Sequence, residues 1–232
     1  MKNVIEAYGI TKIYKNEDAV LKGISLKVEQ GSFTVMLGPS GSGKTTLLNI
    51  LSGLLKPTQG TVRFGRDNIT DMSQAQLAGW KRRKTGNIFQ NYLLLNNLTI
   101  RENIEIGKAP DSAPLSLDQL AKLLELEALL DKFPAQLSGG QQQRAAVARA
   151  VIKKPDILFC DEATGALDES NSKKVVSLLH ALKSAFGITV LFVTHNLQIA
   201  ETADRVITIK DGLLYSDQYN DSPIRAEDMV WQ

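Results

Sequence analysis

The alternation of apolar and polar residues predicts short strands and a helix in the N-terminal part of the chain. Residues 20–28 alternate apolar and polar side chains, which is typical of a half-buried strand. Residues 33–37 are mostly apolar and predict a buried strand. A glycine-rich turn follows, and leucine and isoleucine then recur at helical spacing over residues 45–55, up to Pro57. This part of the chain therefore predicts a strand, a glycine loop and a helix in succession.

The C-terminal part returns to the same alternation of elements. Residues 157–160 and 188–193 are apolar runs that predict buried strands, and residues 171–186 have a helical pattern between them. Asp211-Gly212 lies between two further apolar runs, which predicts a hairpin. Because buried strands alternate with helices, we expect a largely parallel sheet that helices cover.

A helical lobe is predicted between about residues 91 and 140. Ser116 has the position of a helix N-cap, and Gln119 would complete a capping box with it. Five apolar residues of this lobe share one face at helical spacing: Leu117, Leu120, Ala121, Leu124 and Ala128. The pattern predicts a helix that packs on its own lobe.

The simplest organisation is one α/β domain with this helical lobe inserted into it. We expect a single domain over residues 1–232, divided as follows: a core of about 1–90 and 141–217, a helical subdomain of about 91–140, and a C-terminal tail of 218–232. No motif is recognisable in the tail.

Composition supports a folded protein and argues against a nucleic-acid-binding face. Hydrophobic residues make up 43% and charged residues 22% of the 232 residues, which is ordinary for a globular domain. The net charge of +2 is too small for a strongly basic surface. The one dense basic run, residues 81–84, has no aromatic residues between its charges and is interpreted as a solvated helix face.

The sequence predicts no membrane span. The longest apolar stretch is about residues 190–193, whereas a spanning helix needs about 20 such residues. No apolar signal segment follows Met1-Lys2. Cys160 is the single cysteine, which fits a reducing compartment. We therefore expect a cytoplasmic location.

The strongest chemical motif is the loop of residues 38–45, whose sequence GPSGSGKT matches the pattern G-x-x-x-x-G-K-[ST]. Its glycines let the backbone curl around a phosphate, and the helix that follows presents its positive end. Lys44 can hold the β- and γ-phosphates, and the Thr45 hydroxyl can bind Mg²⁺. The loop alone predicts a nucleoside triphosphate with Mg²⁺, without naming the reaction.

Asp161 and Glu162 follow the buried strand at residues 157–160 directly. Ligands of α/β sheets bind at the carboxyl ends of strands. Asp161 is therefore a candidate for the Mg²⁺ shell, and Glu162 can accept a proton from an attacking water molecule. Taken alone, the pair could equally be solvated loop residues.

Residues 137–141 read LSGGQ and form a second glycine turn before a helix. Its free N–H groups could make a second anion site. An ordinary helix start with Ser138 as N-cap is an equally good interpretation of these residues alone.

Together these motifs resemble those of the ABC-type ATPases, in the family's order and over about residues 5–215. The matching positions are Tyr14 for the adenine-stacking aromatic residue, 38–45 for the Walker A loop, Gln90 for the Q-loop, 137–141 for the signature, 157–162 for Walker B with its glutamate, 166–168 for the D-loop, and His195 for the switch histidine. The resemblance implies a P-loop NTPase (RecA-like) core with an antiparallel β subdomain and an inserted α-helical subdomain.

The resemblance also implies how these residues act. Two subunits pair head to tail, and each ATP lies between the Walker A loop of one and the signature of the other. The expected catalytic residues are Glu162, His195, Gln90 and Lys44, and the expected Mg²⁺ residues are Thr45, Gln90 and Asp161. The nucleotide is expected against Tyr14, Gly38, Ser40, Gly41, Ser42, Gly43, Lys44, Thr45 and Thr46, and across the dimer against Ser138, Gly139, Gly140, Gln141 and Asp168.

The stretches around the loop and the signature look most like the LolD/MacB/FtsE branch. This implies an integral-membrane permease partner at the inner face of the membrane, and export or extraction of a peptide, lipid or antibiotic. The alternative is an FtsE-like ATPase that transmits force without moving a substrate. A nucleic-acid-associated ABC ATPase would have long insertions or two ATPase domains, and this chain has neither. Ala163 stands where the family usually has proline. His180 has no motif around it and is expected to be structural.

Overall fold

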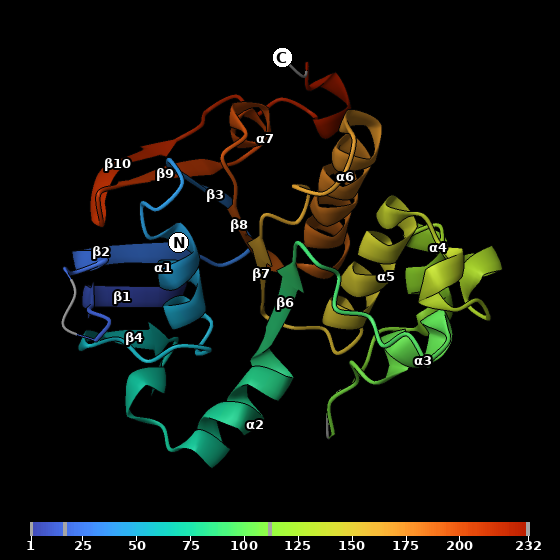
Figure 1. The fold of residues 1–232 in the computed structure, drawn as a ribbon, viewed down its shortest axis with the longest axis horizontal. Coiled ribbons are helices and arrows are strands. Elements are labelled where there is room, and N and C mark those ends of the chain that lie inside the picture. The colour runs from blue at the N-terminus through green and yellow to red at the C-terminus, as the bar shows by residue number, and fades with distance from the viewer. Residues whose placement is uncertain (1, 16–17, 111–112, 231–232) are drawn as a thin grey trace.

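The computed structural model describes residues 2–15, 18–110 and 113–230. A six-stranded sheet lies at the centre, in the order β10-β9-β3-β8-β7-β6 (Figure 1). Its strands are β3 (Phe33–Leu37), β6 (Thr85–Phe89), β7 (Ile157–Asp161), β8 (Thr189–Val193), β9 (Arg205–Lys210) and β10 (Leu213–Tyr219). All neighbouring pairs are parallel except β9 and β10, which form the predicted hairpin.

A second sheet is antiparallel and has the order β2-β1-β4-β5. Its strands are β1 (Asn3–Lys12), β2 (Leu21–Glu29), β4 (Gln59–Phe64) and β5 (Asp67–Asn68). It lies with α1 (Lys44–Leu51) on one side of the central sheet, at the left of Figure 1. The parallel core and the antiparallel sheet confirm the predicted fold class.

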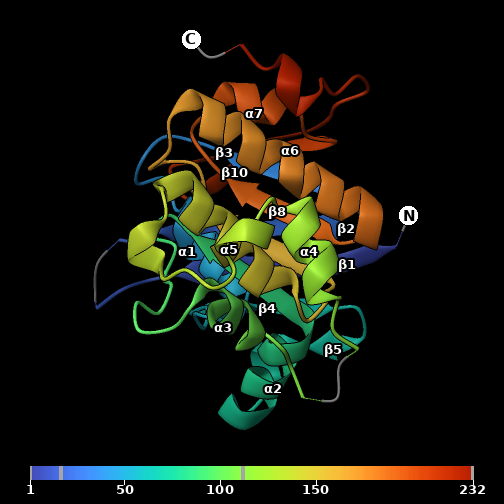
Figure 2. The same ribbon diagram turned by 90° about the vertical axis from the view of Figure 1, so that its right-hand side faces the viewer.

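Helices cover the other side of the central sheet. They are α3 (Ile100–Glu105), α4 (Leu117–Leu123), α5 (Gly139–Val151) and α6 (Glu169–Phe186), and Figure 2 shows them from this side. Helix α2 (Gln74–Lys84) leads into β6, and α7 (Leu197–Glu201) follows β8. Short 3-10 turns occupy Ile69–Asp71, Glu127–Leu129, Pro134–Gln136 and Ala226–Asp228.

The central strands are mostly apolar because both of their faces are buried. Along β7, Ile157 and Phe159 pack toward the antiparallel sheet and α1, whereas Leu158 and Cys160 pack toward α5 and α6. The side chains of a strand alternate between its faces, so one apolar run contributes to two cores. Packing on both faces of the sheet therefore holds the carboxyl ends of these strands in place.

Two predicted helices end earlier in the structure than expected. Helix α1 ends at Leu51 rather than near residue 55, because Gly53 takes a left-handed conformation (φ 70°). A Cβ at Gly53 would lie 2.9 Å from a methyl carbon of Leu77 of α2, so a larger residue there would have to displace that side chain and adopt the left-handed conformation. Leu54 is exposed as a result.

Helix α4 ends at Leu123, and Ala128 is exposed in the next turn rather than on the apolar face. The left-handed residue Glu125 (φ 52°) redirects the chain. Ser116 caps α4 by accepting from the Gln119 N–H at 3.4 Å. The reciprocal bond of a capping box is absent from the hydrogen bonds of the described part of the chain.

His180 and the basic run behave as the sequence predicts. The His180 ring stacks on Phe33 with ring centroids 3.9 Å apart, and its Nε2 lies 3.0 Å from the Thr202 hydroxyl. Burial lowers its pKa from 6.5 to about 4, so this histidine is a neutral core residue. Residues 81–84 form the last turn of α2, and Lys84 pairs with Asp156 at 3.0 Å.

Among the described residues, no helix is both long and apolar enough to cross a membrane.

Candidate functional site

The glycine loop connects β3 to α1 in a conformation that excludes larger residues. Gly38 has φ 150°, and a Cβ there would overlap the Ile209 carbonyl oxygen. Gly43 has φ 99°, and a Cβ there would lie 2.7 Å from a methyl carbon of Leu21. Gly43 is also the N-cap of α1, and no side chain caps this helix. The first N–H groups of α1 thus face the loop, as an anion site requires.

Lys44 places its ammonium group inside this loop. Its Nζ donates to the carbonyl oxygens of Gly38 and Pro39, each at 2.8 Å. Burial lowers the pKa of Lys44, and the carboxylates of Glu162 and Asp161 act in the opposite direction. A buried cation near two carboxylates, at the uncapped start of α1, is well placed to bind a polyanion.

Thr45 and Asp161 meet at the carboxyl end of β7. The Thr45 hydroxyl donates to Asp161 Oδ1 at 3.0 Å, although the two residues are far apart in the sequence. Burial raises the pKa of Asp161; the hydrogen bond from Thr45 lowers it, and Glu162 raises it further. A hydroxyl and a carboxylate are oxygen ligands of the kind that Mg²⁺ prefers. In the described residues no group of three or more His, Cys, Asp or Glu side chains could hold a metal ion by itself.

Glu162 follows Asp161 in a left-handed conformation (φ 45°), which an ordinary residue adopts only when its surroundings hold it there. Its N–H donates to the Val193 carbonyl of β8 at 3.0 Å. Its Oε1 lies 3.4 Å from His195 Nδ1. The backbone of two neighbouring strands therefore brings this carboxylate and this imidazole together.

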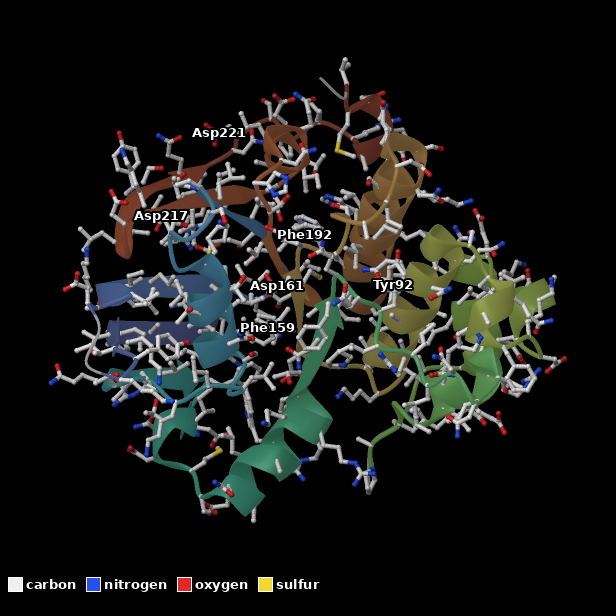
Figure 3. All side chains as sticks on the ribbon, in the orientation of Figure 1. Tyr92, Phe159, Asp161, Phe192, Asp217 and Asp221 are labelled. Carbon is white, nitrogen blue, oxygen red and sulfur yellow. The ribbon has the colours of Figure 1, made fainter. Side chains whose placement is uncertain are left out.

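Two cavities adjoin at these residues. One, of about 420 Å³, is lined by Thr45, Gln90, Asp161 and Glu162 among others, and Figure 3 shows Asp161 at the centre of the molecule. The other, of about 350 Å³, is lined by Tyr14, Val20, Ser40, Gly41, Gly43, Lys44, Thr45, Thr46 and Glu162. Thr45 and Glu162 border both cavities, so the Walker A, Walker B and Q-loop positions form one continuous site.

Tyr14 and Ser42 occupy different places around the loop. Tyr14 is half-exposed at the rim of the second cavity, and Lys12 Nζ lies 5.2 Å from the centre of its ring. The partly exposed Tyr14 ring therefore borders the mouth of the loop. Ser42 is buried, and its hydroxyl has no hydrogen-bond partner among the described residues.

The turn at 138–141 lies apart from the loop. Ser138 caps α5: its Oγ accepts from the Gln141 N–H at 3.4 Å, and its own N–H donates to Gln141 Oε1 at 2.9 Å. Gly140 packs so closely on Asn171 that no Cβ fits. Asn171 in turn donates to Asp168 through its backbone N–H at 2.8 Å. Within the described ranges, no hydrogen bond or shared cavity joins residues 138–141 to residues 38–46.

The sequence analysis missed two residues that brace the site. Gln143 is buried on α5 and donates to the Ala163 carbonyl oxygen at 2.7 Å, directly beyond Glu162. Arg149 of α5 donates to the backbone after Gln90, at Tyr92 and its neighbour. No local pattern distinguishes Gln143 or Arg149 from the other polar residues of their helix, because their partners come from distant segments.

The chain is similar to known ATP-binding proteins over nearly all of its length. An ABC transporter ATP-binding protein of Mycoplasma pneumoniae is 43% identical over 237 residues, which cover 99% of this chain and 51% of that protein. The chain thus spans about half the length of that relative. The bacitracin export ATP-binding protein BceA of Halalkalibacterium halodurans is 42% identical over 219 residues, covering 92% of this chain and 85% of that protein.

A solved structure is also similar. The ATP-binding cassette MJ0796, in a dimeric post-hydrolysis state bound to ADP and Pi, has a TM-score of 0.83 and 36% identity, and the match covers 94% of this chain and 99% of that one. The family model described as ABC transporter matches residues 21–165. With the loop, the carboxylate pair and the signature turn arranged as above, the chain belongs to the ABC transporter family of ATP-binding proteins.

Proposed function

We propose that this chain hydrolyses ATP in the presence of Mg²⁺. The observation that carries the proposal is the convergence of Lys44, the Thr45–Asp161 pair and Glu162 on two adjoining cavities at one edge of the central sheet, with His195 in contact with Glu162. The relative in a post-hydrolysis state supports hydrolysis at family level.

Each residue has a role that follows from its position. Lys44 and the N–H groups of α1 bind the phosphates. Thr45, Asp161 and Gln90 would hold Mg²⁺, which would supply positive charge against the phosphates. Glu162 accepts a proton from the attacking water molecule, and His195 orients this carboxylate from the side of β8. Tyr14 stacks on the base at the rim.

The separation of the two glycine turns supports a head-to-tail dimer. The turn at 138–141 has an exposed serine, Ser138, and it shares no cavity with the loop of its own chain in the described residues. A second copy could bring this turn, with Asp168, against the phosphates in the first chain's loop. ATP would then stabilise the closed dimer because it contacts both copies there.

We further propose that the dimer drives an integral-membrane permease from the inner face of the membrane. The name of BceA associates a close relative with bacitracin export, which supports export of a peptide, lipid or antibiotic. It gives no support to the force-transmitting alternative. The small net charge gives none to a nucleic-acid partner.

The substitution Glu162→Gln tests hydrolysis and dimer formation together. It keeps the shape of the side chain but removes the proton acceptor, so kcat should fall about 100-fold or more. ATP affinity should persist, and ATP with Mg²⁺ should convert monomers into a lasting dimer in light scattering.

The matched control is Glu127→Gln at an exposed glutamate, which should hydrolyse ATP at the wild-type rate. Unchanged turnover in Glu162→Gln would exclude Glu162 as the base. A variant that stays monomeric with bound ATP would contradict the shared site.

A further inference from the structure

The segment after Gln90 has a backbone conformation that its surroundings must enforce. Tyr92 and Leu93 are consecutive non-glycine residues with left-handed φ values of 48° and 53°. Such conformations are sparsely populated and persist where other contacts hold them. Leu93 also lines the cavity with Gln90, Asp161 and Glu162. The enforced bend is therefore part of the wall of the site.

Arg149 supplies the contacts that hold this bend. Its Nη1 donates to the Leu93 carbonyl oxygen at 2.6 Å, and its Nη2 donates to the Tyr92 carbonyl oxygen at 2.8 Å. One planar guanidinium thus binds the carbonyls of both left-handed residues, a geometry that a lysine cannot reproduce. Burial lowers the pKa of Arg149, in keeping with its enclosed position.

Tyr92 is held a second time through its side chain. Its hydroxyl lies against Gly139, where a Cβ would be only 2.8 Å away. Gly139 is the first residue of α5, and Arg149 lies near the end of the same helix. Tyr92 therefore contacts α5 at both of its ends, and Figure 3 shows it on the α5 side of Asp161.

The far end of the segment is fixed as well. Asn103, a fully buried residue of α3, accepts from the Leu95 N–H at 2.7 Å and donates to the Leu95 carbonyl oxygen at 3.0 Å. Between Gln90 and this anchor, the backbone attachments to α5 run through Arg149. A shift of the Gln90 segment would thus be transmitted to α5 and to the turn at 138–141.

We propose that Arg149 and Tyr92 link the Gln90 side of the ATP site to the position of the turn at 138–141. Arg149 is a positioning residue: it lines neither of the two cavities, and it acts through the backbone at Tyr92 and Leu93. The inference rests on the proposed function and deepens it. It names the contacts that position the turn at 138–141 relative to the ATP site of the same chain.

The test compares three variants with a matched control. Arg149→Ala removes both hydrogen bonds, Arg149→Lys can restore one, and Tyr92→Ala removes the contact with Gly139. Arg101→Ala is the control, because Arg101 belongs to the same group of helices and its side chain pairs, within the described part of the chain, only with Asp131 at an exposed position. Kinetics, ATP affinity and amide exchange are measured on the full chain.

Arg149→Ala should lower kcat by about 10- to 100-fold, the effect of misplacing a catalytic constellation by about 1 Å. ATP affinity should change by no more than about twofold, because Lys44 and its loop make no contact with Arg149. Arg149→Lys and Tyr92→Ala should be intermediate. Amide exchange should accelerate in residues 91–98 and also in residues 138–142.

Three results would overturn the link. These are a wild-type kcat in Arg149→Ala, a fall in ATP affinity equal to the fall in kcat, and faster exchange confined to residues 91–98. Absence of hydrolysis in both the wild-type protein and Arg101→Ala would instead refute the proposed function. The exchange pattern would still decide whether the link exists.

Discussion

Helices α1 and α5 both begin at glycine turns, but the two turns satisfy their N–H groups differently. The N-cap of α1 is Gly43 in a left-handed conformation, and no side chain caps that helix. The N-cap of α5 is Ser138, which forms a complete capping box with Gln141. The first turn of α1 therefore keeps its donors available for an anion, whereas α5 satisfies part of its own.

The difference indicates two kinds of phosphate contact. The loop before α1 is a binding site within one chain, with an ammonium group and free N–H groups in one place. The α5 turn is stable by itself, and it still has one donor to offer. Ser138 Oγ uses a lone pair to accept from Gln141, so its hydroxyl hydrogen remains available to a phosphate of another chain.

Loss of Lys44 should have the largest effect, because it removes the positive charge from the loop before α1, which binds phosphate within one chain. Lys44→Ala should weaken ATP binding about 100-fold or more, or about 3 kcal/mol. Isothermal titration calorimetry on the monomer measures this directly. Lys22→Ala, at an exposed lysine of β2, should bind as the wild type does. Equal ATP affinity in Lys44→Ala and Lys22→Ala would show that the loop does not bind the phosphates.

The central sheet and the loop could be predicted because their signals are local. A strand buried on both faces is a continuous apolar run, and residues 157–160 and 188–193 form the predicted strands. The loop motif is contiguous, and the glycines within residues 38–45 determine its conformation. The sequence also named Thr45 and Asp161 as residues of one site, and the structure places them in hydrogen-bond contact.

The missed features depend on contacts between distant segments. Helix α1 stops at Leu51, where Gly53 takes a left-handed conformation beside Leu77 of α2, and the apolar spacing within residues 45–55 does not reveal this contact. Arg149 looks like any arginine on a polar helix face until Tyr92 is placed beside it. Such partners come together through tertiary packing, and a single sequence does not encode them as a period or a motif.

A Cβ at Gly43 should have the next largest effect. Gly43→Ala forces alanine into a left-handed conformation against Leu21, which should lower the free energy of unfolding by about 1–3 kcal/mol. Gly79→Ala is the control: Gly79 lies within α2, and its added Cβ would make only an ordinary 3.5 Å contact with Arg83. That control should gain up to about 1 kcal/mol. Urea unfolding compares Gly43→Ala with Gly79→Ala. Similar changes in their free energies of unfolding would show that the loop does not require glycine at position 43.

Ser138→Ala should cause the smallest change in the free energy of unfolding. It should also separate the roles of the turns before α1 and α5 most clearly. Loss of the cap should lower the free energy of unfolding by about 1 kcal/mol. ATP affinity of the monomer should stay at the wild-type value, because residues 38–46 bind it, whereas hydrolysis should fall at concentrations where dimers form. Ser116→Ala is the matched control, since Ser116 also caps a helix, α4, through one 3.4 Å bond. It should lose similar stability and keep full hydrolysis. If Ser138→Ala weakened ATP binding to the monomer as Lys44→Ala does, both turns would contact one nucleotide within one chain, and the division of labour between α1 and α5 would be wrong.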